Sequence, residues 1–145
     1  LDFGSGPGPT LSVMLEEAGH TVALYDPLYA PHPQVFENCY DFITATEVLE
    51  HLHNPGKELD RLWSCLKKGG VLGVMTKLAL DEKAFSKWHY KNDLTHVSFY
   101  SKETFHWLEK KWNAEITFEN ADVILIKKNA ATARGGNGNF NFLGA

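Results

Sequence analysis

The sequence predicts an α/β protein with a doubly wound, mostly parallel sheet. Short apolar runs that are typical of strands alternate with segments whose apolar residues recur at helical spacing, as expected for a parallel sheet covered by helices. A glycine-rich turn, Gly4-Ser5-Gly6-Pro7-Gly8, follows the first run, and an acidic residue, Asp26, ends the second. A length of 145 residues fits one domain.

The first strand, helix and strand occupy residues 1–25. Leu1 to Phe3 has the composition of the end of a buried strand, and Thr21 to Tyr25 predicts the second strand. Between them, Thr10 is expected to cap a helix that ends at Gly19. The apolar face of this helix is expected to carry Leu11, Met14, Leu15 and Ala18.

The middle of the chain predicts a third strand at 41–46 and a fourth at 71–76. The segment between the second and third strands is short and rich in proline, so we expect the fold to be shortened there. A helical turn is predicted at 47–53, and a longer helix follows it, which Gly69-Gly70 is expected to end. The apolar positions of this helix are Leu59, Leu62, Trp63 and Leu66.

The last third predicts two helices and a hairpin. Residues 81–88 form a short helix in this prediction, and Ser101 caps a longer one with Phe105, Leu108 and Trp112 on one stripe. Strands at 115–118 and 123–127 form the hairpin, which gives the sheet an antiparallel C-terminal edge strand. We assign 1–128 to one domain and expect 129–145, rich in Gly, Asn and Ala, to be a disordered tail.

Composition limits the classes of partner. A net charge of −4 argues against binding to long nucleic-acid duplexes, which lysine and arginine hold through phosphates. No apolar run approaches the roughly 20 residues of a membrane span, and no signal peptide is visible. Cys39 and Cys65 fit no metal spacing, so we expect reduced thiols in a cytoplasmic protein. The sequence starts at Leu1, inside a motif, so we expect that further residues precede it and that the fold is truncated at its N-terminus.

The glycine turn predicts a ligand at the end of the first strand. Glycine lets a strand turn sharply into a helix while the backbone approaches a ligand closely. Asp26 could accept hydrogen bonds from a ribose, or could simply form a turn before Pro27. The spacing G-x-G-x-G differs from the G-x-G-x-x-G of dinucleotide enzymes. Asp2, two residues before the first glycine, suits a cationic ligand better than a pyrophosphate.

These residues resemble those of the class I S-adenosylmethionine-dependent methyltransferases, which have a Rossmann-like fold. The motif D-x-G-x-G-x-G matches residues 2–8, and the ribose-binding acid matches Asp26. The resemblance continues through residues 40–43, 47–52 and 66–72 and covers roughly residues 1–128. It implies that S-adenosylmethionine is the cofactor. The cofactor-binding residues it implies are Asp2, Gly4, Ser5, Gly6, Gly8, Asp26, Pro27 and Glu47.

Glu47, Glu50 and His51 form an E-x-x-E-H pattern that would place three ligand side chains on one helical face. His53 should face elsewhere. The pattern is similar to that of the ubiquinone-biosynthesis O-methyltransferases and of the small-RNA 2′-O-methyltransferases. Residues 93–105 resemble the stretch that supplies a further histidine in the second group, here His96. The resemblance implies a metal site of Glu47, Glu50, His51 and His96, suited to Mg²⁺; alternatively these residues only shape the pocket.

Trp88, His89 and Tyr90 lie in a segment that in this class covers the acceptor site, although ordinary packing would also explain the two aromatic residues. We therefore expect methyl transfer from S-adenosylmethionine to a small-molecule acceptor, at oxygen, with His51 or His96 deprotonating the acceptor or holding a metal. Two alternatives stay open. One is an NAD(P)-binding oxidoreductase, and the other is an inactive nucleotide-binding fragment.

Overall fold

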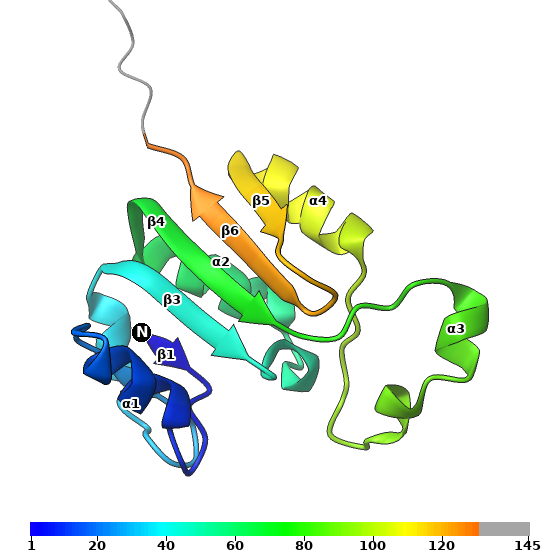
Figure 1. Ribbon diagram of the computed structural model, residues 1–145, viewed down its shortest axis with the longest axis horizontal. Coiled ribbons are helices and arrows are strands. Elements are labelled where there is room, and N and C mark those ends of the chain that lie inside the picture. Colours follow the sequence, from blue (N-terminus) through cyan, green and yellow to red (C-terminus); the bar gives the residue numbers. More distant parts are fainter. Residues whose placement is uncertain (131–145) are drawn as a thin grey trace, which may run out of the picture.

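A computed structural model describes residues 1–130, which form a six-stranded sheet with helices on both faces (Figure 1). The predicted tail lies, from residue 131 onward, outside the described residues. The strands are β1 (Asp2–Phe3), β2 (Leu24–Tyr25), β3 (Tyr40–Thr46), β4 (Leu66–Met75), β5 (Ala114–Phe118) and β6 (Val123–Lys128). The α-helices are α1 (Thr10–Glu17), α2 (Pro55–Cys65), α3 (Glu82–Ser86) and α4 (Lys102–Trp112), and the 3-10 helices are η1 (Pro33–Glu37), η2 (Leu49–His51) and η3 (His89–Asn92).

The sheet has the predicted doubly wound, mostly parallel arrangement. Its strand order is β2-β1-β3-β4-β6-β5, and the first four strands in this order are parallel. The C-terminal strand β6 is antiparallel to both β4 and β5, which confirms the predicted antiparallel strand. It lies one position in from the edge, and β5 is the edge strand. The carboxyl ends of β1, β2, β3 and β4 therefore share one edge of the sheet.

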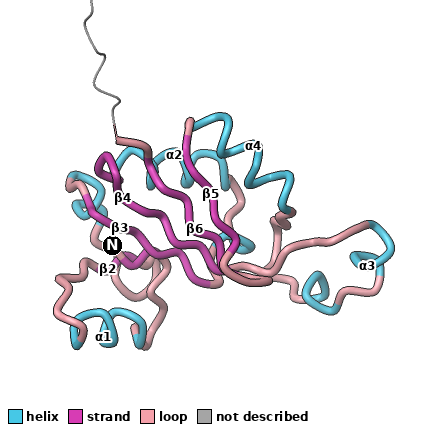
Figure 2. The backbone as a smooth tube through the Cα atoms, turned by 45° about the horizontal axis from the view of Figure 1, so that its top comes forward, coloured by secondary structure: helices cyan, strands magenta, loops and turns pink. Residues whose placement is uncertain are grey.

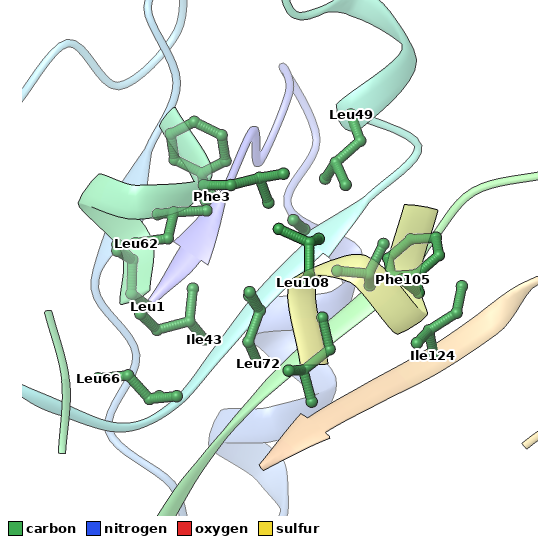
Figure 3. Packing of buried hydrophobic residues seen from close by; sticks show 14 of the residues in the cluster. Leu1, Phe3, Ile43, Leu49, Leu62, Leu66, Leu72, Phe105, Leu108 and Ile124 are labelled. Atoms are coloured by element: carbon green, nitrogen blue, oxygen red, sulfur yellow. The ribbon is translucent and has the colours of Figure 1, made fainter. Parts of the chain in front are cut away.

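The helices divide between the two faces of the sheet. Helix α1 lies on one face, while α2 and α4 lie on the other, as both views show (Figure 1, Figure 2). The main core fills the space between the sheet and the second pair of helices, and Figure 3 shows its side chains interleaving. Alternate residues of the central strands point into it, as the strand period requires. Among its fully buried members are Ile43, Ala45, Leu72, Ile124 and Ile126, together with Leu62 of α2 and Phe105 of α4.

Helix α1 begins and packs differently from the prediction. Its N-cap is Pro9, and Thr10 is the first helical residue. The buried residue is Ser12, whose hydroxyl donates to the Pro9 carbonyl at 2.7 Å, whereas Met14 is 60% exposed. The expected apolar face is therefore correct only in part, because Leu11 and Leu15 are half-buried while Met14 and Ala18 are exposed, and the most buried side chain is the small polar Ser12. Gly19, with φ +90°, follows the helix end as expected.

Helix α2 ends at Cys65, earlier than the predicted stop at Gly69-Gly70. The two glycines lie inside β4, at an irregularity in its pairing with β3. A Cβ on Gly70 would lie 2.8 Å from the carbonyl oxygen of Asp41, so the close approach of the neighbouring strand explains that glycine. The end of α2 is stabilised instead by Lys128, whose ammonium donates to the carbonyls of Trp63 and Leu66 at 2.7 and 2.8 Å.

The connection between β2 and β3 is short, as predicted, and contains only η1. Val35 and Phe36 of η1 pack against the core beside β2. A second connection, residues 77–100 between β4 and α4, protrudes from the body of the molecule (Figure 1, Figure 2) and is called the arm below. The arm carries α3 and η3, and a bridge between Leu78 and Tyr100 joins its two ends. No helix within residues 1–130 is long and apolar enough to cross a membrane.

We expect Lys128→Ala to lower the free energy of unfolding by about 2 kcal/mol, because two carbonyls at the end of α2 lose a charged donor. Urea denaturation followed by circular dichroism measures the change. The control is Lys127→Ala, the neighbouring exposed lysine on the same strand. Equal losses in the two variants would contradict the capping role.

Candidate functional site

The candidate site is a cavity of about 760 Å³ at the carboxyl ends of β1, β2 and β3. Ligands bind in this position in open α/β sheets, and the volume is that of an ordinary small-molecule site. Six of the predicted site residues line it: Gly4, Gly6, Asp26, Pro27, Glu47 and His51. The rest of its wall comes mainly from the loops after β2 and β3 and from α2.

The glycine turn has the backbone that the motif requires. Gly4 has φ +77° and Gly6 has φ +64°, which is the left-handed region that favours glycine. A Cβ on Gly4 would overlap the Val48 side chain, so the loop after β1 and the loop after β3 touch here. The hydroxyl oxygen of Ser5 is buried and has no hydrogen-bond partner within residues 1–130. Ser5 itself is not among the residues that line the cavity.

Asp26 already holds the local backbone together. One carboxylate oxygen accepts from the Gly6 N–H at 3.0 Å, and the other accepts from the N–H groups of Leu28 and Tyr29 at 2.8 and 3.1 Å. The side chain thus fastens the glycine turn to the loop after β2. Asp26 also lines the cavity while being only 8% exposed. Its turn-forming role, which we considered as an alternative, therefore coexists with a place on the cavity wall.

Asp2 and Gly8 lie at the margins of the turn. Asp2 is buried in β1 and accepts a hydrogen bond from the Thr44 hydroxyl at 2.9 Å. Burial raises the pKa of Asp2, and the bond from Thr44 opposes that rise. Gly8 is exposed where the turn leads into α1, and its carbonyl accepts from the Thr10 N–H. Asp2 thus supports the strand next to the cavity, and Gly8 shapes the entry to the helix.

Glu47 stands at the end of β3 with an unusual backbone. Its φ of +52° is left-handed, although it is not glycine, and its N–H donates to the Met75 carbonyl at 2.8 Å. Strain of this kind persists where surrounding structure imposes it and is concentrated at functional sites. Burial raises the pKa of the Glu47 carboxyl, and the nearby Glu50 carboxyl raises it further. Glu47 is thus a strained carboxyl group on the cavity wall.

Three of the four predicted metal ligands come together. Glu50, His51 and His96 each offer a ligand atom within 4.8 Å of the others. The two imidazole rings lie 4.8 Å apart between centroids. The Nδ1 atoms of His51 and His96 lie 3.1 and 2.7 Å from the carbonyl oxygens of Thr95 and Tyr90. A carbonyl can only accept, so each Nδ1 carries a proton. In the neutral imidazole with that tautomer the lone pair that can bind a metal is on Nε2, and the Nε2 of His96 lies 3.8 Å from a carboxylate oxygen of Asp93.

Tyr90 was expected either to cover the acceptor site or to pack as an ordinary aromatic residue, and its hydroxyl contacts the two glutamates of the candidate site. Its hydroxyl donates to a carboxylate oxygen of Glu50 and lies 3.2 Å from one of Glu47. Burial and the Glu50 carboxylate both raise the pKa of Tyr90, so the phenol keeps its proton. The sequence of the arm could not predict these contacts, because they form only when the arm folds back onto η2.

The sequence did not identify the residues that α2 contributes to the cavity wall. Glu58 and Arg61 line it from α2, 3.3 Å apart, and the guanidinium carbon of Arg61 lies 3.3 Å from the ring centroid of Phe36. Together with Asn54 they recur at i, i+4 and i+7, so helical spacing could have identified this polar stripe. His53, which we expected to face away from the site, lines the cavity as well.

A doubly wound sheet with a glycine turn and an acid after its second strand is typical of nucleoside-binding α/β folds. Sequence comparison identifies the family. A family profile described as a methyltransferase domain matches residues 1–118. The chain belongs to this family, which confirms the predicted methyltransferase class. No curated protein sequence matches the chain.

Solved methyltransferase structures share the fold. Human N-acetylserotonin methyltransferase in complex with S-adenosylmethionine superposes with a TM-score of 0.62 at 18% identity, over 89% of this chain and 47% of that one. An O-methyltransferase family protein from Burkholderia thailandensis superposes with a TM-score of 0.61 at 11% identity, over 89% of this chain and 50% of that one. Mitomycin 7-O-methyltransferase superposes with a TM-score of 0.53 at 16% identity, over 89% of this chain and 48% of that one. The chain thus spans about half the length of these proteins, and the likeness shows the fold.

We expect Glu47→Gly to raise the free energy of unfolding by about 1 kcal/mol, because glycine adopts a left-handed φ without strain. Chemical denaturation measures it. The same variant should bind S-adenosylhomocysteine more weakly, since a cavity carboxyl is lost. The control is Asn113→Gly, which also has a left-handed φ but lies at the end of α4; it should leave binding unchanged. A lower free energy of unfolding in Glu47→Gly would contradict the claim that the backbone of Glu47 is strained.

The raised pKa of Glu47 predicts a pH dependence of stability. The folded state holds this proton more tightly than the unfolded state does, so the contribution to stability is fully present below the unfolded pKa of 4.5. It is lost as the pH rises through the folded-state pKa. Glu47→Gln, which does not titrate, should therefore lose less stability between pH 4 and pH 7 than the wild type, as measured by thermal denaturation. Identical pH profiles would contradict the shift.

Proposed function

We propose that this chain is the catalytic core of an enzyme that transfers a methyl group from S-adenosylmethionine to an oxygen of a small-molecule acceptor. Family membership supports the reaction class. The observation that carries the proposal is a single cavity that reaches from the glycine turn to His51. Cofactor and acceptor groups could therefore lie in one cavity, where close positioning removes much of the barrier to a transfer reaction.

The cavity residues fit S-adenosylmethionine. Gly4 lies on the cavity wall and leaves no room for a side chain next to Val48, so its backbone can approach a ligand closely. The bound cofactor would supply an electrophilic methyl group on a sulfonium. Gly4, Gly6 and Glu47 would hold its methionine part, and Asp26 and Pro27 its ribose. Asp26 can accept a ribose hydroxyl through the lone pair that its three backbone bonds leave free.

The histidines would act on the acceptor. The Nε2 lone pairs of His51 and His96 can remove a hydroxyl proton, or they can bind a cation that lowers the pKa of that hydroxyl. One buried carboxylate and two imidazoles make a mixed oxygen and nitrogen donor set. Such a set suits Mn²⁺ better than Mg²⁺, which prefers oxygen ligands and water. Glu47 lies outside this group of three and is linked to Glu50 through the Tyr90 hydroxyl, which contacts both carboxyl groups.

The partner that we propose is a small molecule, in keeping with the size of the cavity. The likeness to ubiquinone-biosynthesis O-methyltransferases stays a prediction, as does a cytoplasmic location. Family membership favours S-adenosylmethionine over a nicotinamide cofactor. An inactive nucleotide-binding fragment would keep the cavity but not turn over, and single-turnover methyl transfer separates it from an enzyme.

Isothermal titration of S-adenosylhomocysteine into the chain tests the cofactor assignment. We expect 1:1 binding, and Asp26→Ala should weaken it at least about tenfold, because a charged hydrogen bond to a ribose hydroxyl is lost together with the bond that fastens the Gly6 backbone. The control is Asp41→Ala, an exposed carboxylate that pairs with Lys67 at the other end of β3. Binding that Asp26→Ala leaves intact would refute the ribose contact, and NADH binding without S-adenosylhomocysteine binding would refute the cofactor class.

A further inference from the structure

Tyr90 is buried although it comes from the protruding arm. It lies in η3 and is 7% exposed, while His89 and Asn92 on the same turn are exposed. Its ring lies over His96, with 4.1 Å between the centroids, and next to Trp88 at 5.0 Å. The arm therefore folds back at this point and places one side chain among the candidate cation ligands.

The hydroxyl of Tyr90 completes the hydrogen bonding of Glu50. Glu50 is 1% exposed, and a buried carboxylate is costly unless its oxygens accept hydrogen bonds. One oxygen accepts from the Thr76 hydroxyl at 3.0 Å, and the other accepts from the Tyr90 hydroxyl. Thr76 comes from the end of β4 and Tyr90 from the arm. The orientation of this carboxylate is thus set from two sides, one of which depends on the arm.

The backbone of Tyr90 orients His96. The carbonyl oxygen of Tyr90 accepts from the Nδ1 of His96 at 2.7 Å, and the ring of Tyr90 packs against the same imidazole. A hydrogen bond at Nδ1 fixes both the tautomer and the direction of the Nε2 lone pair. One residue therefore contacts two candidate ligands that belong to different segments, Glu50 on η2 and His96 in the arm.

We propose that Tyr90 is a positioning residue that holds Glu50 and His96 in the arrangement that binds a divalent cation. This rests on the cation site of the proposed function. A packing role alone would need only the ring, which contacts Trp88 and the ammonium of Lys77. The hydroxyl aimed at Glu50, with Glu47 3.2 Å away, is what packing does not require.

The test is the affinity of the full chain for Mn²⁺, measured by electron paramagnetic resonance of the free ion in the wild type and in Tyr90→Phe. Loss of a hydrogen-bond partner of a metal ligand weakens binding about 10- to 100-fold, and we expect a rise of that size in Kd. The matched control is Tyr100→Phe. Tyr100 lies at the root of the same arm, is equally buried, and donates its hydroxyl to the Leu49 carbonyl at 2.7 Å.

The outcomes separate clearly. Weaker Mn²⁺ binding in Tyr90→Phe, with wild-type affinity in Tyr100→Phe, supports the proposal. Equal affinities in all three proteins overturn it, and equal weakening in both variants overturns it too, since a loosened arm would then explain the loss. If Tyr90→Phe does not fold, Thr76→Val tests the other donor to Glu50, and unchanged affinity there overturns the positioning of Glu50.

A parallel titration with S-adenosylhomocysteine distinguishes failure of this inference from failure of the proposed function. A wild-type chain that binds the nucleoside but no Mn²⁺ removes the cation site and the role of Tyr90, and leaves the cofactor assignment standing. A chain that binds Mn²⁺ with the expected response to Tyr90→Phe but no nucleoside supports the inference and removes the cofactor assignment.

Discussion

The contact between Gly4 and Val48 is the constraint on which the rest of the site depends. It brings the loop after β1 against the loop after β3, and a side chain at position 4 would prevent it. Two residues at this contact have a left-handed backbone: Gly4 itself, and Glu47, which precedes Val48. Glycine adopts this conformation freely, whereas the glutamate does so at a cost in stability. The two adjoining loops then form one wall of the cavity.

Burial of Glu50 is the second constraint, and it ties the arm to the sheet. The backbone carbonyl of Glu50 accepts from the N–H groups of Val97 and Ser98, while its carboxylate accepts from Thr76 and Tyr90. Without the hydroxyl groups of Thr76 and Tyr90, the buried carboxylate would have no hydrogen-bond donor, which is costly in a protein interior. The arm is thus held at η2 by a carboxylate that lies next to the histidines. Binding at the site and docking of the arm should therefore be linked thermodynamically.

Much of the fold could be predicted from the sequence, because helical and strand periodicity report local packing. The order of the elements, the cap at Ser101 and the closing hairpin were predicted in this way. The face of α1 and the end of α2 were not, because a small buried Ser12 and a strand approaching Gly70 are tertiary effects. Of the site, the glycine turn and the histidines were predictable from motifs. Tyr90 and Arg61 were not assigned, since their contacts join segments far apart in the chain.

The central claim is that one cavity joins the glycine turn to His51, whose ring lies 4.8 Å from that of His96 between centroids. The most direct measurement is nuclear magnetic resonance mapping of backbone amides, first on addition of S-adenosylhomocysteine and then of paramagnetic Mn²⁺. The account predicts shifts at Gly4, Gly6 and Val48 with the nucleoside, and broadening centred on His51 and His96 with the ion. Shifts or broadening centred on α4 and the β5–β6 hairpin instead, away from the carboxyl ends of the parallel strands, would contradict it.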